Sequence, residues 1–442
     1  GTTANPKLAM LPHGRFIRHC ARYLERDPRG PDDDYVCMLP LPWIMEQIYV
    51  AAMPLICRIR VNFPESGETA MHDMREIGPT HLLLAPRVWE QTAADVRARI
   101  MDASKANQWL YRTAMARGIE AVEAGRRDWF ADTFLFRALK DRLGFRYVKS
   151  AATGGAALGP DTFKFFLAMG VPLRQLYGQT ELLGAYTLQQ GDAIDFDSSG
   201  VPFEGVELRI DNADANGVGE IVTRHPNMFE GYYRAPEATA DTLQDGWMHT
   251  GDAGYLDDKG RLVIIDRLKD IATTSTGDRF SPQYIENKLK FSPYIGECVV
   301  LGNGRPFVTA ILCIRFSMVA KWAEQRRMGF TTYANLAANE QTYELLAGEV
   351  ATVNASLPEA QGIKRFLLLF KELDADDGEL TRTRKVRRNV IDDRYGDLIG
   401  ALYDGSPRAL IETEVTFEDG RKGTIKADMA IRDSARTELE AA

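Results

Sequence analysis

The sequence predicts an α/β protein in which a large N-terminal domain with mixed, βαβ-containing sheets precedes a small α+β C-terminal domain. Two observations carry this prediction. Residues 147–177 show a strand, a glycine-rich turn, a helix and a second strand in that order. After residue 267, separate hairpins and helices replace this pattern. A βαβ unit implies a parallel sheet that binds ligands at the carboxyl ends of its strands.

Residue types at the ends of the segments define the βαβ unit. The first strand lies in RYVKSAATGG and the second in VPLRQLYG. Between them, PDTFKFFLAMG is a helix opened by Pro160 and Asp161 and stopped at Gly170. Further short strands are expected in VELRI, GEIVTRHP and GYLDDKGRLVIID, the last of which folds back at its DDKG turn.

We place a domain boundary at Arg267, which gives domains 1–267 and 268–442. In the second domain a helix is expected in SPQYIENKLK, a hairpin in CVVLG and FVTAILCI, and a strand in FLLLF. A late hairpin is expected in VTFEDGRKGTIKA, turning at Asp419 and Gly420.

Composition excludes several classes of protein. The 442 residues, 45% hydrophobic and 26% charged, are ordinary for a globular chain of two or three domains. A net charge of −8 provides no excess of cations for general nucleic-acid binding. Five scattered cysteines without a CxxC pair indicate reduced thiols and a cytoplasmic location. The most apolar stretch, LPLPWIMEQIYVAAMPLIC, is too interrupted for a transmembrane helix, while peripheral contact with a membrane stays open.

The pentapeptide YGQTE follows the second strand of the βαβ unit, where a parallel sheet presents ligands. Tyr177 offers an aromatic face and Gly178 allows close approach to the backbone. Thr180 offers a hydroxyl and Glu181 an oxygen ligand for Mg²⁺. A turn with a solvated glutamate fits the same five residues.

Two further motifs, TGD at 250–252 and DRLKD at 266–270, have polar residues in turns. The Asp252 carboxylate can accept hydrogen bonds from both hydroxyls of a ribose, although aspartate is also common in ordinary turns. Arg267 and Lys269 fit a solvated linker. They also fit an arginine for a nucleotide and a hinge that absorbs dihedral change at Lys269.

Basic residues occur in two other segments that fit phosphate chemistry. The chain opens on GTTANPK, which ends at Lys7 but does not match the GxxxxGK[ST] loop, so an ordinary disordered terminus is the alternative. The run GELTRTRKVRR contains Lys385, whose flexible side chain can reach into a site from a mobile domain. Such runs are more often solvated surfaces.

Taken in order, these motifs resemble the adenylate-forming superfamily of acyl-CoA synthetases, adenylation domains and luciferases. Segments such as LPLPWIMEQIY, REIGPTHLLLAPRVWE, FEGYYRAPEAT and WMHTGDAGYLDDKGRLVIIDRLKD are similar to its bacterial long-chain fatty acyl-CoA synthetase branch. The resemblance covers essentially the whole chain. It implies that the chain begins inside the phosphate loop, so that the N-terminal domain is truncated, and that the C-terminal domain is mobile.

The resemblance implies ATP, Mg²⁺ and coenzyme A as cofactor and co-substrates, and it assigns a nucleotide site. The residues expected to contact the nucleotide are Thr2, Thr3, Lys7, Gly155, Ala156, Ala157, Tyr177, Gly178, Thr180, Asp252, Arg267 and Lys385. Among them, Thr2, Thr3 and Lys7 would hold the β- and γ-phosphates. Tyr177 would stack on the adenine, while Asp252 would bind the ribose.

The implied catalytic residues are Lys385, Thr180 and Glu181, with Glu181 as the magnesium ligand. A fatty carboxylate attacks the α-phosphorus of ATP, and the Lys385 ammonium stabilises the negative charge that gathers there. The C-terminal domain would then rotate about Lys269. This rotation would bring in the loop of Thr276, Gly277 and Asp278 for attack by the coenzyme A thiol.

Two positions depart from the family pattern. Leu8 stands where a glycine commonly follows the loop lysine, and Trp43 stands where many relatives have histidine. An aromatic residue at position 43 can wall the acyl or thiol tunnel but supplies no imidazole, although a tryptophan in an apolar run is more often an ordinary core residue.

Three functions fit the sequence. The first is an ATP-dependent fatty acid–CoA ligase that forms an acyl-adenylate. The second is an adenylate-forming ligase that uses another acid or a carrier-protein thiol. The third is a catalytically inactive fragment of such an enzyme, motivated by the start at Gly1. Acyl length, acceptor and oligomeric state are not encoded in these motifs.

Overall fold

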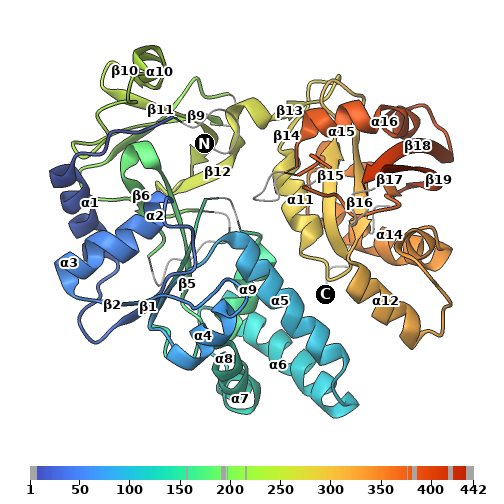
Figure 1. The fold of residues 1–442 in the computed structure, drawn as a ribbon, viewed down its shortest axis with the longest axis horizontal. Coiled ribbons are helices and arrows are strands. Elements are labelled where there is room, and N and C mark those ends of the chain that lie inside the picture. Colours follow the sequence, from blue (N-terminus) through green and yellow to red (C-terminus); the bar gives the residue numbers. More distant parts are fainter. Residues whose placement is uncertain are drawn as a thin grey trace. The chain divides into compact units, whose positions relative to one another are not determined.

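A mixed sheet forms the centre of the N-terminal part of the molecule (Figure 1). The computed structural model describes residues 7–155, 158–190, 196, 198–214, 217–375, 377–380, 386–416 and 422–434, except the side chains of 412–416 and 422–426. Within these ranges the sheet has seven strands in the order β2-β1-β3-β4-β5-β6-β7. They are β1 (Asp34–Val36), β2 (Arg60–Asn62), β3 (His81–Leu83), β4 (Ser150–Thr153), β5 (Leu173–Gln179), β6 (Gly184–Leu188) and β7 (Val201–Pro202). Strands β1 to β5 pair in parallel, whereas β6 and β7 add antiparallel pairs.

Helices cover both faces of this sheet. Successive side chains of a strand point to opposite faces, so neighbouring residues of one strand contact different helices. Leu82 and Ala151 pack with α4, α5, α6 and α9, whereas Leu83 and Ala152 pack with α1, η1 and α3. The helices of this region are α1 (His13–Arg26), α2 (Ile44–Gln47), η1 (Ile48–Ala52), α3 (Met53–Cys57), α4 (Ala70–Ile77), α5 (Pro86–Met101), α6 (Lys105–Glu123), α7 (Trp129–Ala131), η2 (Asp132–Phe136), α8 (Arg137–Leu143) and α9 (Pro160–Ala168).

The predicted βαβ unit is confirmed as β4, α9 and β5. Strands β4 and β5 are parallel, with Ala151 paired to Leu173. Helix α9 begins with Pro160, which has no backbone N–H to leave unsatisfied, and carries Asp161 in its first turn. Gly170 follows the helix with φ of 76°, the left-handed conformation that glycine adopts readily.

A second sheet in the N-terminal part of the molecule contains the strands predicted after residue 205. Its described order is β10-β11-β9-β8, with β12 paired to β11. Its strands are β8 (Glu207–Asp211), β9 (Gly219–Arg224), β10 (Leu243–Gln244), β11 (Trp247–Leu256) and β12 (Leu262–Arg267). The helical elements of this part of the chain are η3 (Thr180–Leu182), α10 (Pro236–Thr242) and η4 (Leu268–Asp270). The β11–β12 hairpin turns at the predicted DDKG residues and is antiparallel.

A buried ion cluster, formed by Asp27, Arg29, Arg174 and Ser150, joins α1 to the first residues of β4 and β5. Arg29 has no exposed side-chain surface and pairs with Asp27. Arg174 Nη2 lies 2.5 Å from Asp27 Oδ1, and Ser150 Oγ donates to Asp27 Oδ2 over 3.0 Å. Burial raises the pKa of Asp27, but the charges of the two arginines and of His81 outweigh it and lower the pKa below its ordinary value.

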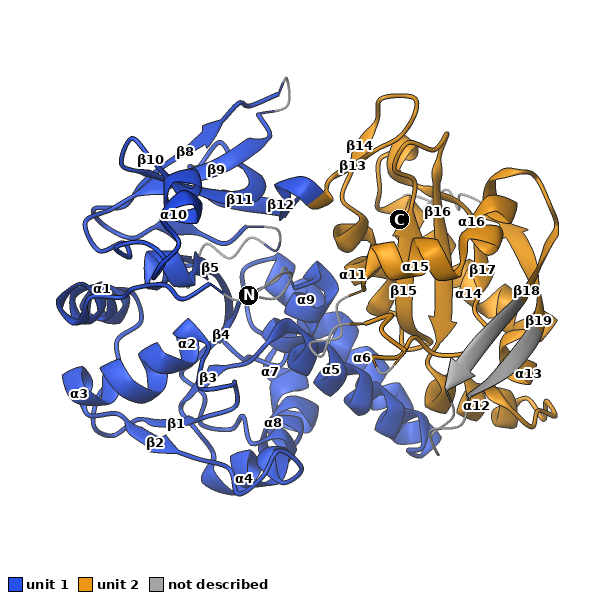
Figure 2. Cartoon of the chain, turned by 45° about the horizontal axis from the view of Figure 1, so that its top comes forward, with its two compact units in different colours: residues 1, 3–269 blue, residues 2, 270–442 orange. Residues whose placement is uncertain are grey.

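The chain divides after Lys269 into two compact units, called unit 1 and unit 2 (Figure 2). Unit 2 contains a sheet of described order β15-β16-β17-β19-β18 and a separate β13–β14 pair. Its elements are β13 (Ala272–Thr273), β14 (Arg279–Phe280), α11 (Pro282–Lys290), β15 (Ile295–Leu301), β16 (Val308–Ile314), α12 (Phe316–Gln325), α13 (Tyr333–Ala337), α14 (Glu340–Ala355), η5 (Glu359–Gln361), β17 (Ile363–Leu368), α15 (Arg388–Arg394), α16 (Gly396–Tyr403), β18 (Arg408–Thr416) and β19 (Lys422–Asp433).

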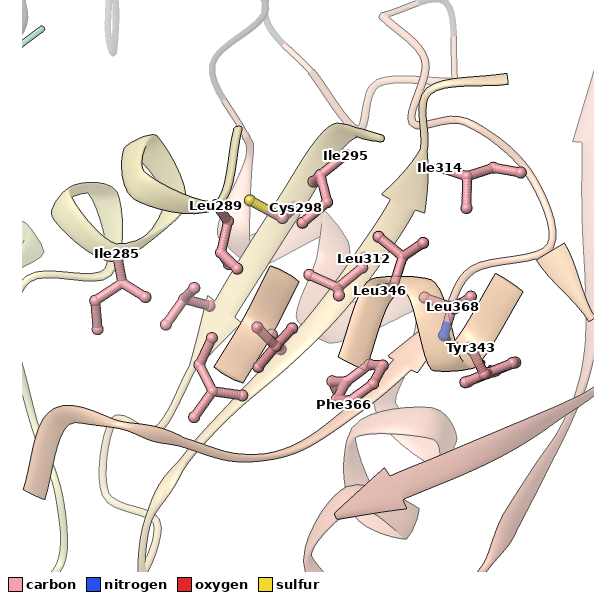
Figure 3. Packing of buried hydrophobic residues seen from close by; sticks show 14 of the residues in the cluster. Ile285, Leu289, Ile295, Cys298, Leu312, Ile314, Tyr343, Leu346, Phe366 and Leu368 are labelled. Atoms are coloured by element: carbon pink, nitrogen blue, oxygen red, sulfur yellow. Dashed lines mark hydrogen bonds between the residues drawn. The ribbon is translucent and has the colours of Figure 1, made fainter. Parts of the chain in front are cut away.

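The core of unit 2 lies on both faces of its sheet. On one face Leu312 and Phe366 pack with Leu289 of α11 and Leu346 of α14 (Figure 3). The predicted helix 282–290, the β15–β16 hairpin and the strand at β17 are confirmed. The late hairpin is confirmed as antiparallel β18 and β19, while its predicted turn at Asp419 and Gly420 lies outside the described residues.

None of the helices described here combines the length and the apolar composition that crossing a membrane requires.

Candidate nucleotide-binding site

Asp252 is the centre of a polar cluster in unit 1. Strand pairing places it opposite Arg267, whose Nε lies 3.0 Å from Asp252 Oδ1. Tyr177 donates its hydroxyl to Asp252 Oδ2 over 2.5 Å, and Gln179 Nε2 donates to the same oxygen over 2.6 Å. The Asp252 side chain is 8% exposed and that of Arg267 is 50% exposed. The structure therefore brings the YGQTE, TGD and DRLKD motifs together at one carboxylate.

The TGD turn coincides with an irregularity in strand pairing. The ladder between β11 and β9 shifts register between His249 and Ala253, and Gly251 adopts φ of 67°. Glu220 of β9 binds this bulge: one carboxylate oxygen accepts from Gly251 N over 3.0 Å, and the other lies 2.9 Å from His249 Nδ1. A bulge re-aims the following side chain, which is how Asp252 comes to face β5.

Tyr177 is the buried hydrogen-bond partner of Asp252. Tyr177 is 8% exposed, and its ring packs edge-on against Tyr186, with ring centroids 5.3 Å apart. Burial, followed by the influence of Tyr186 and Asp252, raises the pKa of Tyr177 well above its ordinary value. The phenol is therefore a hydrogen-bond donor at neutral pH. Its stacking on an adenine stays a prediction, whereas its hydrogen bond to Asp252 was not anticipated from the sequence.

The glycines near the strand ends differ in how much space surrounds the position of a Cβ atom. A Cβ on Gly178 would lie 2.0 Å from the carbonyl oxygen of Gly184, so close packing of β6 requires glycine there. A Cβ on Gly154 would lie 2.3 Å from Leu176 Cδ1. Gly155 has φ of 85°, and among the described residues no atom lies within 4 Å of the position that a Cβ would occupy.

Glu181, Tyr232 and Lys7 form a second polar cluster, which we call the Tyr232 cluster. Tyr232 donates its hydroxyl to Glu181 Oε1 over 2.6 Å. Lys7 Nζ lies 5.0 Å from the centroid of the Tyr232 ring. The structure thus joins the lysine expected for phosphate to the glutamate expected for magnesium. Thr180, beside Glu181, is exposed.

Backbone pairing fixes this cluster. Met10 N donates to Gly231 O over 2.9 Å, and Tyr233 N donates to Leu8 O over 2.8 Å. Phe229 N donates to Glu181 O over 2.8 Å. The segment that follows Lys7, the segment that carries Tyr232 and the turn that carries Glu181 are therefore tied together by main-chain hydrogen bonds.

Other expected site residues lie elsewhere in the structure or outside its description. Thr2, Thr3, Ala156, Ala157 and Lys385 fall outside the described residues. Lys269 lies in the short η4 turn and is exposed. In unit 2, Thr276 Oγ1 donates to Asp278 Oδ2 over 2.6 Å across Gly277, whose φ is 94°. The hinge and acceptor-loop roles stay predictions.

Three residues of these clusters were missed by the sequence analysis. Gln179 was treated as a spacer within YGQTE, and Glu220 belongs to a strand that showed no motif. Tyr232 lies in FEGYYRAPEAT, a segment noted for its family resemblance but given no role. The sequence signal that could have identified Tyr232 is the position of this aromatic residue between the YGQTE and TGD motifs.

The donor set fits a magnesium ion that arrives with a nucleotide. In the part of the chain that the structure describes, no group of three or more His, Cys, Asp and Glu residues could hold a metal. Mg²⁺ in nucleotide sites takes one or two carboxylates and completes its octahedron with phosphates and water. Glu181, with a carboxylate already oriented by Tyr232, matches that requirement.

The motifs and the fold are those of adenylate-forming enzymes, and the chain belongs to the AMP-binding enzyme family. The family model matches residues 1–233, and the AMP-binding enzyme C-terminal domain matches residues 269–407. The resemblance inferred from the motifs is therefore confirmed.

Curated relatives include long-chain-fatty-acid–CoA ligases. The chain is 28% identical to the ligase heimdall of Drosophila melanogaster, covering 91% of this chain and 67% of that protein. It is 27% identical to FadD15 of Mycobacterium tuberculosis, covering 91% and 68%. The chain thus spans about two thirds of the length of these relatives.

Solved structures confirm the predicted fold class. The adenylation domain of a carboxylate reductase from Mycobacterium chelonae matches with a TM-score of 0.68 at 22% identity, covering 91% of this chain and 59% of that one. The o-succinylbenzoate coenzyme A synthetase of Bacillus subtilis with ATP and magnesium matches with a TM-score of 0.58 at 18% identity, covering 88% and 67%.

Proposed function

We propose that the protein activates a long-chain fatty acid with ATP, as an acyl-adenylate, and transfers the acyl group to coenzyme A. The single observation that carries this proposal is the convergence of Tyr177, Gln179 and Arg267 on Asp252. The names of the curated relatives favour a fatty acid as the substrate and coenzyme A as the acceptor.

Asp252 would accept hydrogen bonds from the ribose hydroxyls. Its carboxylate needs no reorganisation to do so, because Tyr177 and Gln179 hold Oδ2 and Arg267 holds Oδ1. A preorganised group of this kind binds at little cost in conformational entropy. Arg267, half exposed, would present its remaining N–H groups toward the ribose and the α-phosphate.

Phosphate binding would fall to the Tyr232 cluster together with Thr2, Thr3 and Thr180. Bound ATP with Mg²⁺ would supply the electrophilic phosphorus and the pyrophosphate leaving group. Lys7 would place one positive charge beside the phosphates and Glu181 would hold the cation. Lys385 would stabilise the charge that develops where the fatty carboxylate meets the α-phosphate.

We assign residues 1–267 to an adenylation domain and 268–442 to a C-terminal domain that carries Lys385 and moves about Lys269. The division of the chain after Lys269 and the C-terminal family match from residue 269 support this assignment. Movement about an exposed turn of three residues needs few broken contacts.

Pyrophosphate release tests the proposal. The protein is incubated with ATP, Mg²⁺ and palmitate, octanoate, benzoate or acetate in parallel, with and without coenzyme A. Palmitate should give the largest signal, and coenzyme A should increase turnover. Palmitate equal to acetate would contradict the long-chain assignment. If coenzyme A leaves pyrophosphate release unchanged, a carrier-protein thiol is favoured as the acceptor. If none of the four acids gives pyrophosphate release, the inactive-fragment alternative is favoured.

A further inference from the structure

Tyr232 makes two different contacts with residues expected to handle phosphate and metal. Its hydroxyl donates to Glu181 Oε1 over 2.6 Å, and its ring carries the Lys7 ammonium 5.0 Å from the centroid. Tyr232 is half-buried, so neither contact is fully exposed to water. One side chain therefore contacts both an anionic and a cationic residue.

The phenol is the donor in this contact, because its hydroxyl lies 2.6 Å from Glu181 Oε1 and a carboxylate oxygen accepts hydrogen bonds. A protonated phenol can donate to Glu181 Oε1, which leaves Oε2 as the oxygen that would face a cation. A hydrogen bond to a carboxylate is about twice as strong as one between neutral groups.

Tyr232 itself is held on several sides. Its ring packs edge-on against Phe229 with centroids 5.1 Å apart, and its backbone N–H donates to Thr239 Oγ1 over 2.8 Å. Gly231 adopts φ of 133°, and a Cβ there would lie 2.7 Å from Thr239 Cγ2. The preceding glycine is thus required for the turn that directs Tyr232 toward Glu181.

We propose that Tyr232 is a positioning residue for magnesium and phosphate: its hydroxyl orients the Glu181 carboxylate and its ring seats the Lys7 ammonium. The inference rests on the proposed function, since it assigns Glu181 and Lys7 to Mg²⁺ and ATP. Removing a hydrogen-bond partner of a metal ligand typically lowers metal affinity about 10–100-fold. The hydroxyl and the ring make separable contributions.

Tyr232→Phe and Tyr233→Phe form a matched pair of variants. The first removes the hydroxyl bound to Glu181, while the second removes a hydroxyl from a neighbouring side chain that is 50% exposed. Equilibrium binding of a fluorescent ATP analogue is measured over a range of Mg²⁺ concentrations and in EDTA. Tyr232→Phe should raise the half-saturating Mg²⁺ concentration at least about tenfold and leave binding in EDTA unchanged. Tyr233→Phe should behave as the wild type.

The ring contribution is tested by Tyr232→Leu. This variant should show the same magnesium defect. In addition, it should bind the ATP analogue about two- to fivefold more weakly in EDTA, because Lys7 loses its cation–π contact with the ring. A double-mutant cycle keeps the test independent of general destabilisation. In a Glu181→Gln background, Tyr232→Phe should cause no further shift in the Mg²⁺ dependence.

Several outcomes would overturn the proposal. They are a Tyr232→Phe variant with the wild-type Mg²⁺ dependence, an equal shift in the Glu181→Gln background, and a wild type whose ATP binding ignores Mg²⁺. Pyrophosphate release is measured on the same samples. A wild type that binds Mg·ATP but releases no pyrophosphate with any acid would contradict the proposed function and leave the role of Tyr232 intact.

Discussion

The side-chain amide of Gln179 donates a 2.6 Å hydrogen bond to Oδ2 of Asp252, across 73 residues of sequence. The same nitrogen lies 3.0 Å from the carbonyl oxygen of Thr250. Gln179 therefore fastens the end of β5 to the TGD turn, on the side of Asp252 opposite Arg267.

Gln179→Leu should weaken nucleotide binding. The substitution keeps the side-chain volume but removes a hydrogen bond to a buried carboxylate, worth about 1.5–3 kcal/mol, or roughly 10–100-fold in the dissociation constant for ATP. Titration calorimetry with ATP measures the change. Gln244→Leu, at an exposed position, is the control and should bind ATP as the wild type does. Equal affinities for the two variants would contradict the positioning of Asp252 by Gln179.

Asp27→Ala should destabilise unit 1 strongly. It leaves the fully buried Arg29 and the nearly buried Arg174 without their shared carboxylate. Removing one partner of a buried ion pair costs about 3–5 kcal/mol. The free energy of unfolding in urea measures this loss. Asp141→Ala removes a carboxylate that is 58% exposed and is the control. A loss under about 1 kcal/mol for Asp27→Ala would show that the cluster is not a stabilising element.

Stability should fall as pH drops from about 6.5 toward 4, because three buried histidines resist protonation. Burial lowers the pKa of His19 and of His81 to about 4, and burial lowers that of His225 to about 3. Between these values and 6.5 the unfolded chain binds protons that the folded chain does not. Each histidine therefore contributes up to about 1.4 kcal/mol per pH unit, fully present above pH 6.5.

His225 allows this pH dependence to be tested at one position. Its Nε2 is buried without a hydrogen-bond partner in the described structure, and its ring stacks on His19 with centroids 5.5 Å apart. His225→Phe should flatten the curve of unfolding free energy against pH between 4.5 and 6. His72→Phe, at an exposed position, serves for comparison. An unchanged slope in His225→Phe would exclude His225 as a contributor.

Lys385→Ala should separate the two half-reactions. By the role that the family resemblance gives this lysine, ATP–pyrophosphate exchange should fall about 10²–10³-fold. Thioester formation from supplied acyl-adenylate and coenzyme A should change little, because the lysine would be turned away in that step. Lys364→Ala, at an exposed position of β17, is the control. Equal losses in both half-reactions would contradict the two-position mechanism.

Local pattern in the sequence was sufficient for the βαβ unit, the β11–β12 hairpin and the hairpins of unit 2. Each of these is formed by neighbouring segments with their own turn residues, Gly170 being an example. The predicted hairpin also brings Arg267 opposite Asp252, whereas the hydrogen bonds of Tyr177 and Gln179 to Asp252 were not predicted from the sequence.

Features that depend on distant partners could not be read from local pattern. Asp27 and Arg174 are 147 residues apart, and no periodicity links them. Tyr232 lies outside any helix or ladder of strands, in an isolated bridge to Ala9, so strand or helix signals do not place it. Gln179 looks like a spacer because only the tertiary structure supplies its acceptor.

The bridge between residues 8–10 and 230–233 sets the order in which binding competence can arise during refolding. The two segments are far apart in the sequence of unit 1, so their pairing closes a very long loop and adds contacts of high sequence separation. Sheet and helix signals, which arise from nearer neighbours, should return first after dilution from denaturant. Affinity for nucleotide should return later, when the chain start docks and completes the Lys7–Tyr232–Glu181 contact.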